Sequence, residues 1–239
     1  MGNNSFFQFK QFTINQSDCA MKVGTDGVLL GSWTEIKSAN YILDIGTGTG
    51  LIALMLAQKS SAQINAIEIN ELAGKQAAEN FATSPWNKRV QVHICSFQDF
   101  FISSTEKYDL IVSNPPYFSE SLKNPSESRC LARHNDELSQ QDLLIGVQQL
   151  LRKTGRFCVI FPVKEGNNFI DLAEKNNLFC TKKTNVYSNF NTSIKRLLIE
   201  FSPTPSDVPL INNLVIETGE RHSYTEQYKT LTKDCYLNF

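Results

Sequence analysis

The sequence Asp44-Ile45-Gly46-Thr47-Gly48-Thr49-Gly50 joins an apolar segment, Tyr41 to Ile45, to a leucine- and alanine-rich run, Leu51 to Gln58. The segment predicts a buried strand, and the run after it predicts a helix. Alternating glycines let the backbone turn sharply between them and approach a ligand without Cβ clashes. Because α/β folds bind ligands at the carboxyl ends of parallel strands, this turn is a candidate binding site.

Strand and helix alternate after this turn. The next predicted strands are Gln63 to Ile69, Val90 to Cys95, Tyr108 to Ser113 and Arg156 to Phe161. The predicted helices are Glu71 to Phe81, Phe97 to Phe101, Gln140 to Leu151 and, ahead of the turn, Gly24 to Trp33, opened by a Thr25-Asp26 cap. The alternation predicts an α/β, Rossmann-like fold, with a mostly parallel sheet and helices on both faces.

The C-terminal part of the chain changes character. Two runs, Leu178 to Tyr187 and Ile194 to Ser202, flank a polar turn and predict an antiparallel pair of strands. No repeat or second core is visible, so residues 1–239 are predicted to form a single domain. Residues 1–38 are interpreted as an N-terminal extension, and residues 203–239 as a C-terminal hairpin and helix.

Composition limits the classes of function. The 239 residues are 41% hydrophobic and 20% charged, which is typical of globular proteins. A net charge of −1 gives no overall cationic field, so nucleic acid would have to be held by a local cluster of basic residues. Three separated histidines and six cysteines without a CxxC pair predict no metal site. With no signal peptide or membrane helix visible, we expect a cytoplasmic protein.

The ligand of the glycine turn is predicted from two acidic residues. Glu68 ends the second strand about 20 residues after the turn, the distance expected of an acid that binds a ribose. A dinucleotide enzyme would use GxGxxG to place a pyrophosphate at the helix N-terminus. Here Asp44 precedes the turn, which disfavours phosphate and suits an ammonium group. S-adenosylmethionine carries a ribose and an ammonium group but no phosphate, and is the predicted cofactor.

A second motif, Asn114-Pro115-Pro116-Tyr117, directly follows the fourth strand. An exocyclic adenine amine is a weak nucleophile because its lone pair is delocalised into the ring. The Asn114 side-chain oxygen and the Pro115 carbonyl would each accept one N–H and aim the lone pair at a methyl group. The prolines fix φ, and Tyr117 offers a face on which the base can stack. These four residues are the predicted catalytic group.

The two motifs together resemble the class I S-adenosylmethionine-dependent amino-methyltransferases, whose sheet has seven strands with the last one antiparallel. The segments Met21 to Gly31 and Tyr224 to Leu237 resemble one group more closely. Its members are bacterial methyltransferases that modify N6 of the adenosine 3′ of the anticodon, position 37, in a valine tRNA. The resemblance implies a tRNA partner bound through its anticodon loop, and we expect a monomer.

The resemblance also implies the cofactor contacts. The predicted contacts are Thr25, Asp26, Asp44, Gly46, Thr47, Gly48, Gly50, Glu68, Ile69, Ser96, Phe97 and Asn114. Asp44 and the glycines would border the amino-acid part, and Glu68 would bind the ribose. The family often has an acid after the third strand, but Ser96-Phe97 stands there, and Asp99 is three residues late.

Two basic clusters are candidates for contacts with RNA. Lys123, Arg129, Arg133 and His134 lie on a predicted surface loop, Phe118 to Asn135, where they either clamp phosphates or are simply solvated. Lys182, Lys183, Lys195 and Arg196 are interpreted as solvated charges.

Three other functions fit the sequence less well. A protein glutamine N5-methyltransferase could use the same Asn-Pro-Pro-Tyr geometry, but such enzymes usually carry a longer N-terminal recognition domain. A non-catalytic S-adenosylmethionine-binding protein would have no need of the intact motif. A DNA adenine methyltransferase would need a target-recognition element, and no insertion of that size is visible.

Overall fold

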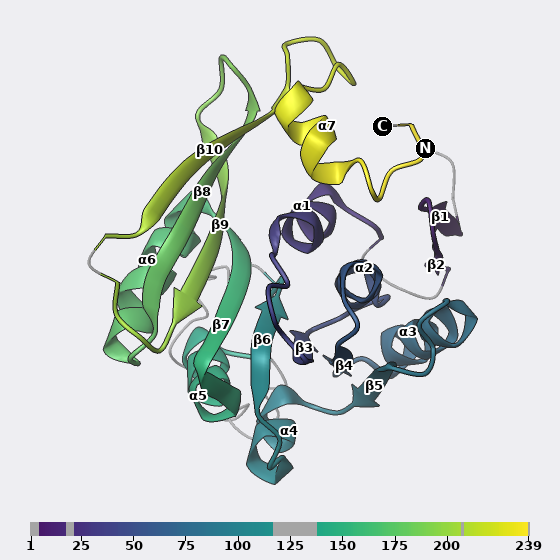
Figure 1. Ribbon diagram of the computed structural model, residues 1–239, viewed down its shortest axis with the longest axis vertical. Coiled ribbons are helices and arrows are strands. Elements are labelled where there is room, and N and C mark those ends of the chain that lie inside the picture. The colour runs from purple at the N-terminus through teal and green to yellow at the C-terminus, as the bar shows by residue number, and fades with distance from the viewer. Residues whose placement is uncertain (1–4, 18–21, 117–137, 207, 239) are drawn as a thin grey trace, which may run out of the picture.

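The computed structural model describes residues 5–17, 22–116, 138–206 and 208–238. Its central strands are β3 (Tyr41–Ile45), β4 (Gln63–Glu68), β5 (Val90–Ile94), β6 (Tyr108–Ser113), β7 (Leu151–Pro162), β8 (Phe179–Asn189), β9 (Ile194–Ser202) and β10 (Leu210–Glu217). They form one sheet in the order β10-β8-β9-β7-β6-β3-β4-β5 (Figure 1). Neighbours from β7 to β5 pair in parallel, whereas β9 is antiparallel to both β7 and β8. The predicted mostly parallel sheet and the antiparallel pair are confirmed.

Within the described residues the sheet has eight strands rather than the predicted seven, because the C-terminal segment adds β10. This strand pairs in parallel with the outer edge of β8, from Leu210 opposite Lys182 to Glu217 opposite Asn189. Burial of Leu214 anchors it to the core. In place of a longer hairpin, a single antiparallel bridge between Glu217 and Tyr224 leads the chain into the last helix.

Helices cover both faces of the sheet (Figure 1). One face carries α1 (Thr25–Trp33), α2 (Leu51–Lys59), α3 (Glu71–Thr83) and α7 (Glu226–Thr232), and the other carries α4 (Phe97–Ser103), α5 (Gln140–Leu150) and α6 (Val163–Lys175). Each layer encloses its own apolar core. A short hairpin of β1 (Phe6–Gln8) and β2 (Thr13–Asn15) forms a separate two-stranded sheet.

Two glycines bring α1 into close contact with α2. A Cβ on Gly27 would lie 3.0 Å from Leu51 Cδ2, and one on Gly31 would lie 2.7 Å from Met55 Sδ. Both contacts advance four residues along each helix, so the two helices run in the same direction. The N-terminus of α1 therefore lies beside the N-terminus of α2. The cap of α1 is Gly24 rather than the predicted Thr25-Asp26, and it makes no side-chain cap hydrogen bond.

Candidate active site

The glycine turn lies at the carboxyl end of β3, as predicted. Gly46 and Thr47 donate backbone hydrogen bonds of 2.9 and 3.0 Å to the Ile67 carbonyl of β4. Gly46 has a φ of 71° and Gly48 a φ of 57°, a backbone region that side chains with a Cβ disfavour. A Cβ at either position would meet nothing within 4 Å among the described atoms, so the turn borders open space.

Asp44 lies directly beneath this turn and is fully buried. Its Oδ2 accepts hydrogen bonds from Thr47 Oγ1 at 2.6 Å and from Ala53 N at 3.1 Å. Its Oδ1 is also buried and has no hydrogen-bond partner among the described residues. Burial raises the pKa of the carboxyl to about 7, because the charged form loses its hydration. A buried carboxylate oxygen without a partner fits a cationic group such as the ammonium of S-adenosylmethionine.

Glu68 is held rigidly at the end of β4. Its Oε2 accepts from Gly48 N at 2.8 Å, and its Oε1 accepts from Asn70 N at 2.9 Å. Each carboxylate oxygen has a second lone pair that could accept a hydrogen bond from a hydroxyl group. Ile69 follows with 47% of its surface exposed and offers an apolar face beside the acid. The predicted proximity of Glu68 to the glycine turn is therefore present in the fold.

At the end of β5, Ser96 and Asp99 are hydrogen-bonded to each other. Ser96 caps α4 by accepting from Asp99 N at 3.0 Å, and its hydroxyl donates to Asp99 Oδ2 at 2.7 Å. The Asp99 carboxylate is thereby tied to the residue that caps α4, and it lines the groove along this helix. The Phe97 side chain is buried against Gly146, so only its backbone N–H is available to a ligand.

The second motif lies next to the glycine turn. Ser113, the last residue of β6, pairs with Ile45 in the sheet, and its Oγ donates to the Ile45 carbonyl at 2.9 Å. Asn114 and Gly46 therefore leave adjacent parallel strands at the same level. Asn114 is half-buried, Pro115 is buried and Pro116 is exposed. Tyr117 lies outside the described residues, as do Lys123, Arg129, Arg133 and His134.

Asp26 has a structural partner that the sequence reading missed. The Arg196 Nε of β9 donates to Asp26 Oδ2 at 2.8 Å, joining the N-terminus of α1 to the far half of the sheet. Thr25 beside it is exposed. The reading of the 182–196 cluster as solvated charges is therefore wrong for Arg196 and also for Lys182, which contacts Glu35 at 2.7 Å. A charge pattern alone does not reveal such distant partners.

Asn80 is a further residue at this site that the sequence reading missed. It is fully buried on α3, and its Nδ2 donates to the Thr49 carbonyl of the glycine turn at 2.9 Å and to the Asn15 carbonyl of β2 at 3.0 Å. Its Oδ1 accepts from Asn15 N at 2.9 Å. Asn80 thus fastens the N-terminal hairpin to the turn. The signal in the sequence that could have indicated this role is an asparagine at a position of the helix where an apolar residue is expected.

We expect Asn80→Ala to lower the free energy of unfolding by about 1–3 kcal/mol, since it leaves the buried Thr49 carbonyl and two part-buried backbone groups of Asn15 without their partner. Urea unfolding measures this loss. Cofactor affinity, measured by calorimetry, should fall with it because the turn is released. An Asn87→Ala variant, which removes an exposed side chain from the loop after α3, is the matched control. Unchanged stability and affinity in Asn80→Ala would contradict this positioning role.

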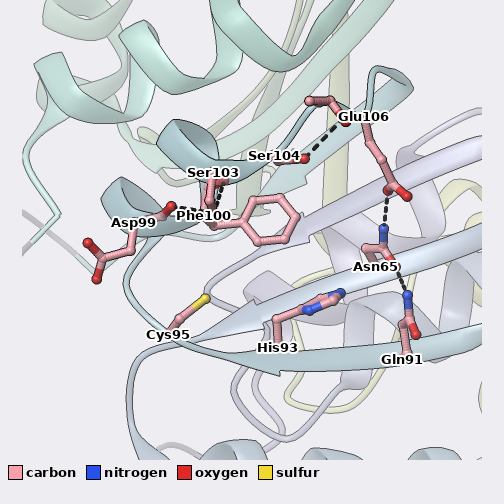
Figure 2. Close-up of a pocket in the computed structure, with 10 residues that line it drawn as sticks. Asn65, Gln91, His93, Cys95, Asp99, Phe100, Ser103, Ser104 and Glu106 are labelled. Atoms are coloured by element: carbon pink, nitrogen blue, oxygen red, sulfur yellow. Dashed lines mark hydrogen bonds between the residues drawn. The ribbon is translucent and has the colours of Figure 1, made fainter.

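A separate groove runs along α4, with a volume of about 410 Å³ (Figure 2). Its polar side chains largely bond one another: Asn65 Nδ2 donates to Glu106 Oε2 at 2.8 Å, and Gln91 Nε2 donates to Asn65 Oδ1 at 2.7 Å. Cys95 and Asp99 lie at one end of it (Figure 2). The groove does not include the glycine turn or Asn114, so we interpret it as a polar network at the sheet edge.

Among the described residues, no group of three or more histidine, cysteine, aspartate or glutamate side chains could hold a metal ion. None of the described helices is long and apolar enough to cross a lipid bilayer.

A family model and two named relatives all identify the chain as similar to methyltransferases. A family model described as "Methyltransferase domain" matches residues 36–227. A protein of Bacteroides thetaiotaomicron named tRNA1(Val) (adenine(37)-N6)-methyltransferase is 48% identical over 238 residues, which cover 98% of each chain. A protein of the same name from Trichodesmium erythraeum is 47% identical over 242 residues and covers 100% of each chain.

Solved structures support the fold. A predicted O-methyltransferase from Agrobacterium tumefaciens superposes with a TM-score of 0.67 at 15% identity, over 88% of this chain and 96% of that one. A glycopeptide N-methyltransferase solved with S-adenosylmethionine has a TM-score of 0.55 at 11% identity, over 76% of this chain and 99% of that one. At these identities the likeness concerns the fold alone.

Proposed function

The chain belongs to the tRNA1(Val) (adenine(37)-N6)-methyltransferase family, and on that premise we propose that it methylates N6 of adenine 37 in the anticodon loop of a valine tRNA. It is an S-adenosylmethionine-dependent enzyme of the class I fold. The observation that carries the proposal is the pairing of Ser113 with Ile45. Asn114 directly follows Ser113 and so leaves the sheet beside the glycine turn, which supports a role in orienting the amine.

The residues around the turn fit the cofactor by their chemistry. Asp44 Oδ1 would accept from its ammonium group, and Glu68 would accept from its ribose hydroxyls. Ile69 would cover one face of its adenine, and Asp99, held by Ser96, would accept from the amine of that adenine. When bound, S-adenosylmethionine supplies a methyl group on a sulfonium, which is already an activated electrophile.

Asn114 and Pro115 would orient the amine of the target base. The Asn114 side-chain oxygen and the Pro115 carbonyl each accept one N–H, which favours a pyramidal nitrogen and directs its lone pair. Fixed φ angles at the two prolines keep the carbonyl from rotating away. The amine nitrogen would bond to the methyl carbon as the bond from that carbon to the sulfonium sulfur breaks, which would leave a neutral thioether. The methylated nitrogen would then release one proton to solvent. No strong base is needed before attack, so positioning supplies most of the catalysis.

Methyl transfer to RNA tests the proposal directly. The purified enzyme, with labelled S-adenosylmethionine, is given tRNA from a strain that lacks the modification, and mass spectrometry of digested RNA maps the label. Label at N6 of adenine 37 in a valine tRNA is the expected result. Absence of transfer to any unmodified tRNA would refute the function. A release factor tested in parallel separates it from methylation of a glutamine amide.

The raised pKa of Asp44 predicts that cofactor binding depends on pH. Below about pH 7 the empty enzyme holds this carboxyl protonated, so an incoming ammonium must displace the proton. We expect the affinity for S-adenosylmethionine to rise about 25-fold between roughly pH 5.5 and pH 7.5, with release of a proton. Calorimetry in buffers of different ionisation enthalpy measures both quantities. An affinity that does not vary over this range would contradict the role of Asp44.

The free energy of unfolding of the enzyme without cofactor should fall as the pH rises, whereas its affinity for the cofactor should rise. Between the ordinary Asp pKa of 3.8 and about 7, the folded state keeps a proton that the unfolded chain has lost. The contribution of Asp44 to the free energy of unfolding therefore falls as pH rises through that window. Asp44→Asn should remove this contribution and the pH dependence of cofactor binding together.

A further inference from the structure

A second cavity opens at the carboxyl edge of the sheet, away from the glycine turn. It has a volume of about 520 Å³ and lies between the N-terminus of α1, the ends of β8 and β10, the start of β9, and the segment leading into α7. Its lining includes Asp26, Lys195, Arg196, His222, Tyr224 and Tyr236. The volume is within the range of about 300–1,000 Å³ that is usual for small-molecule pockets.

The register of the sheet places this cavity beside the proposed active site. Ser113 of β6 pairs with Val159 of β7, and Val159 pairs with Ile199 of β9, so β9 lies two strands or about 10 Å from β6. Arg196 lies three residues nearer the carboxyl edge and pairs with Pro162, the last residue of β7. Both the cavity and Asn114 therefore open at the same edge.

The α1 helix joins the two sites. Its Asp26 lines the cavity and binds Arg196 at 2.8 Å, while Gly27, the next residue, packs against Leu51 at the start of α2. A strand of RNA that delivers a base to Asn114 would have its neighbouring nucleotides within reach of this cavity.

The side chains of the cavity suit a nucleotide. Tyr224 is half-buried and stacks on Tyr228, with ring centroids 5.2 Å apart, so its ring is held at a fixed angle. The exposed Lys195 supplies a positive charge at the start of β9. Aromatic rings and cations in this combination bind single-stranded nucleic acid by stacking and by phosphate contact.

The carboxylates of the cavity are both engaged within the protein. Asp26 accepts from Arg196, and Glu217 Oε1 accepts from His222 N at 3.0 Å. The two carboxylates are also balanced by Arg196 and Lys195, so these four lining residues carry no net negative charge against a phosphate. Since the chain as a whole carries a net charge of −1, contacts of this local kind are what an RNA substrate requires.

We infer that this cavity binds a nucleotide of the anticodon loop that neighbours the target adenine, with its base against Tyr224 and its phosphate at Lys195. The inference rests on the proposed function and specifies how the RNA is held. Extruding one base into an active site unstacks its neighbours, and a second pocket that receives a neighbour stabilises the opened loop.

Substitutions at Lys195 and Tyr224 test the inference. We expect Lys195→Ala and Tyr224→Leu each to weaken binding of an unmodified anticodon stem-loop about tenfold, measured by fluorescence anisotropy. The loss should fall on KM for RNA, while the dissociation constant for S-adenosylmethionine is unchanged. Tyr224→Phe keeps the ring and should bind like wild type. For Lys195→Ala, the salt dependence of binding should also decrease by about one ion.

Lys153→Ala provides the matched control. This exposed lysine lies near the start of β7, at the opposite edge of the sheet, and its removal should leave RNA binding unchanged. If wild type methylates the tRNA while both cavity variants bind RNA as wild type does, the inference is overturned and the function stands. If wild type methylates no tRNA, the function itself fails. Thermal unfolding shows whether Tyr224→Leu has lost RNA binding because it is misfolded. In that case Lys195→Ala, which changes an exposed side chain, decides whether the inference holds.

Discussion

Asn114→Ala will keep its affinity for S-adenosylmethionine but lose about 10²–10³-fold in methyl transfer to tRNA. The side-chain oxygen of Asn114 is one of two acceptors proposed for the target amine, and its loss leaves one N–H undirected. The fold should survive, because Asn114 is only half-buried and the strand end is fixed by the bond from Ser113 to Ile45.

Single-turnover rates with saturating tRNA and cofactor measure the effect on the chemical step, and calorimetry measures cofactor affinity. Asn87→Ala, at an exposed position in the loop after α3, controls for loss of an asparagine elsewhere. A wild-type transfer rate in Asn114→Ala would remove the central argument for an amine substrate. Loss of cofactor binding would instead show that the predicted contact of Asn114 with the cofactor is its main role.

The sequence predicted those parts of the site that depend on short-range order along the chain. Glycines at the end of one strand, Glu68 at the end of the next and Asn114 at the end of a third must meet, since parallel strands end at one edge. The Ser96–Asp99 contact was also predictable, because serine at a cap often pairs with a polar residue three positions later. The sequence analysis noted Asp99 only as an acid three residues late and did not predict its contact with Ser96.

Other features depend on contacts between residues far apart in the sequence. Asp26 and Arg196 are 170 positions apart, and Asn80 joins β2 to the glycine turn across 65 and 31 positions. Such pairs follow from how the layers pack, and no local spacing encodes them. The same holds for β10, whose partner β8 is identified only once the sheet is assembled. The RNA-facing cavity is built almost wholly from features of this kind.

Gly48→Leu and Gly50→Leu should separate cofactor binding from folding. At Gly48 the φ of 57° costs a leucine about 1–2 kcal/mol, but its Cβ meets nothing within 4 Å of the described atoms. The side chain would instead occupy the open space above the turn. We expect a folded protein whose affinity for S-adenosylmethionine falls at least about 100-fold, which corresponds to about 3 kcal/mol.

At Gly50 the added Cβ would lie 2.4 Å from Phe81 Cε1, and the φ is 86°. The overlap adds about 1–3 kcal/mol to the backbone strain, so Gly50→Leu should lose about 2–5 kcal/mol in free energy of unfolding. Adding Phe81→Leu should recover part of the loss, because it relieves the overlap but not the strain. Urea unfolding and calorimetry measure the two effects. If Gly48→Leu binds the cofactor as wild type does, the open space above the turn is not where the cofactor lies.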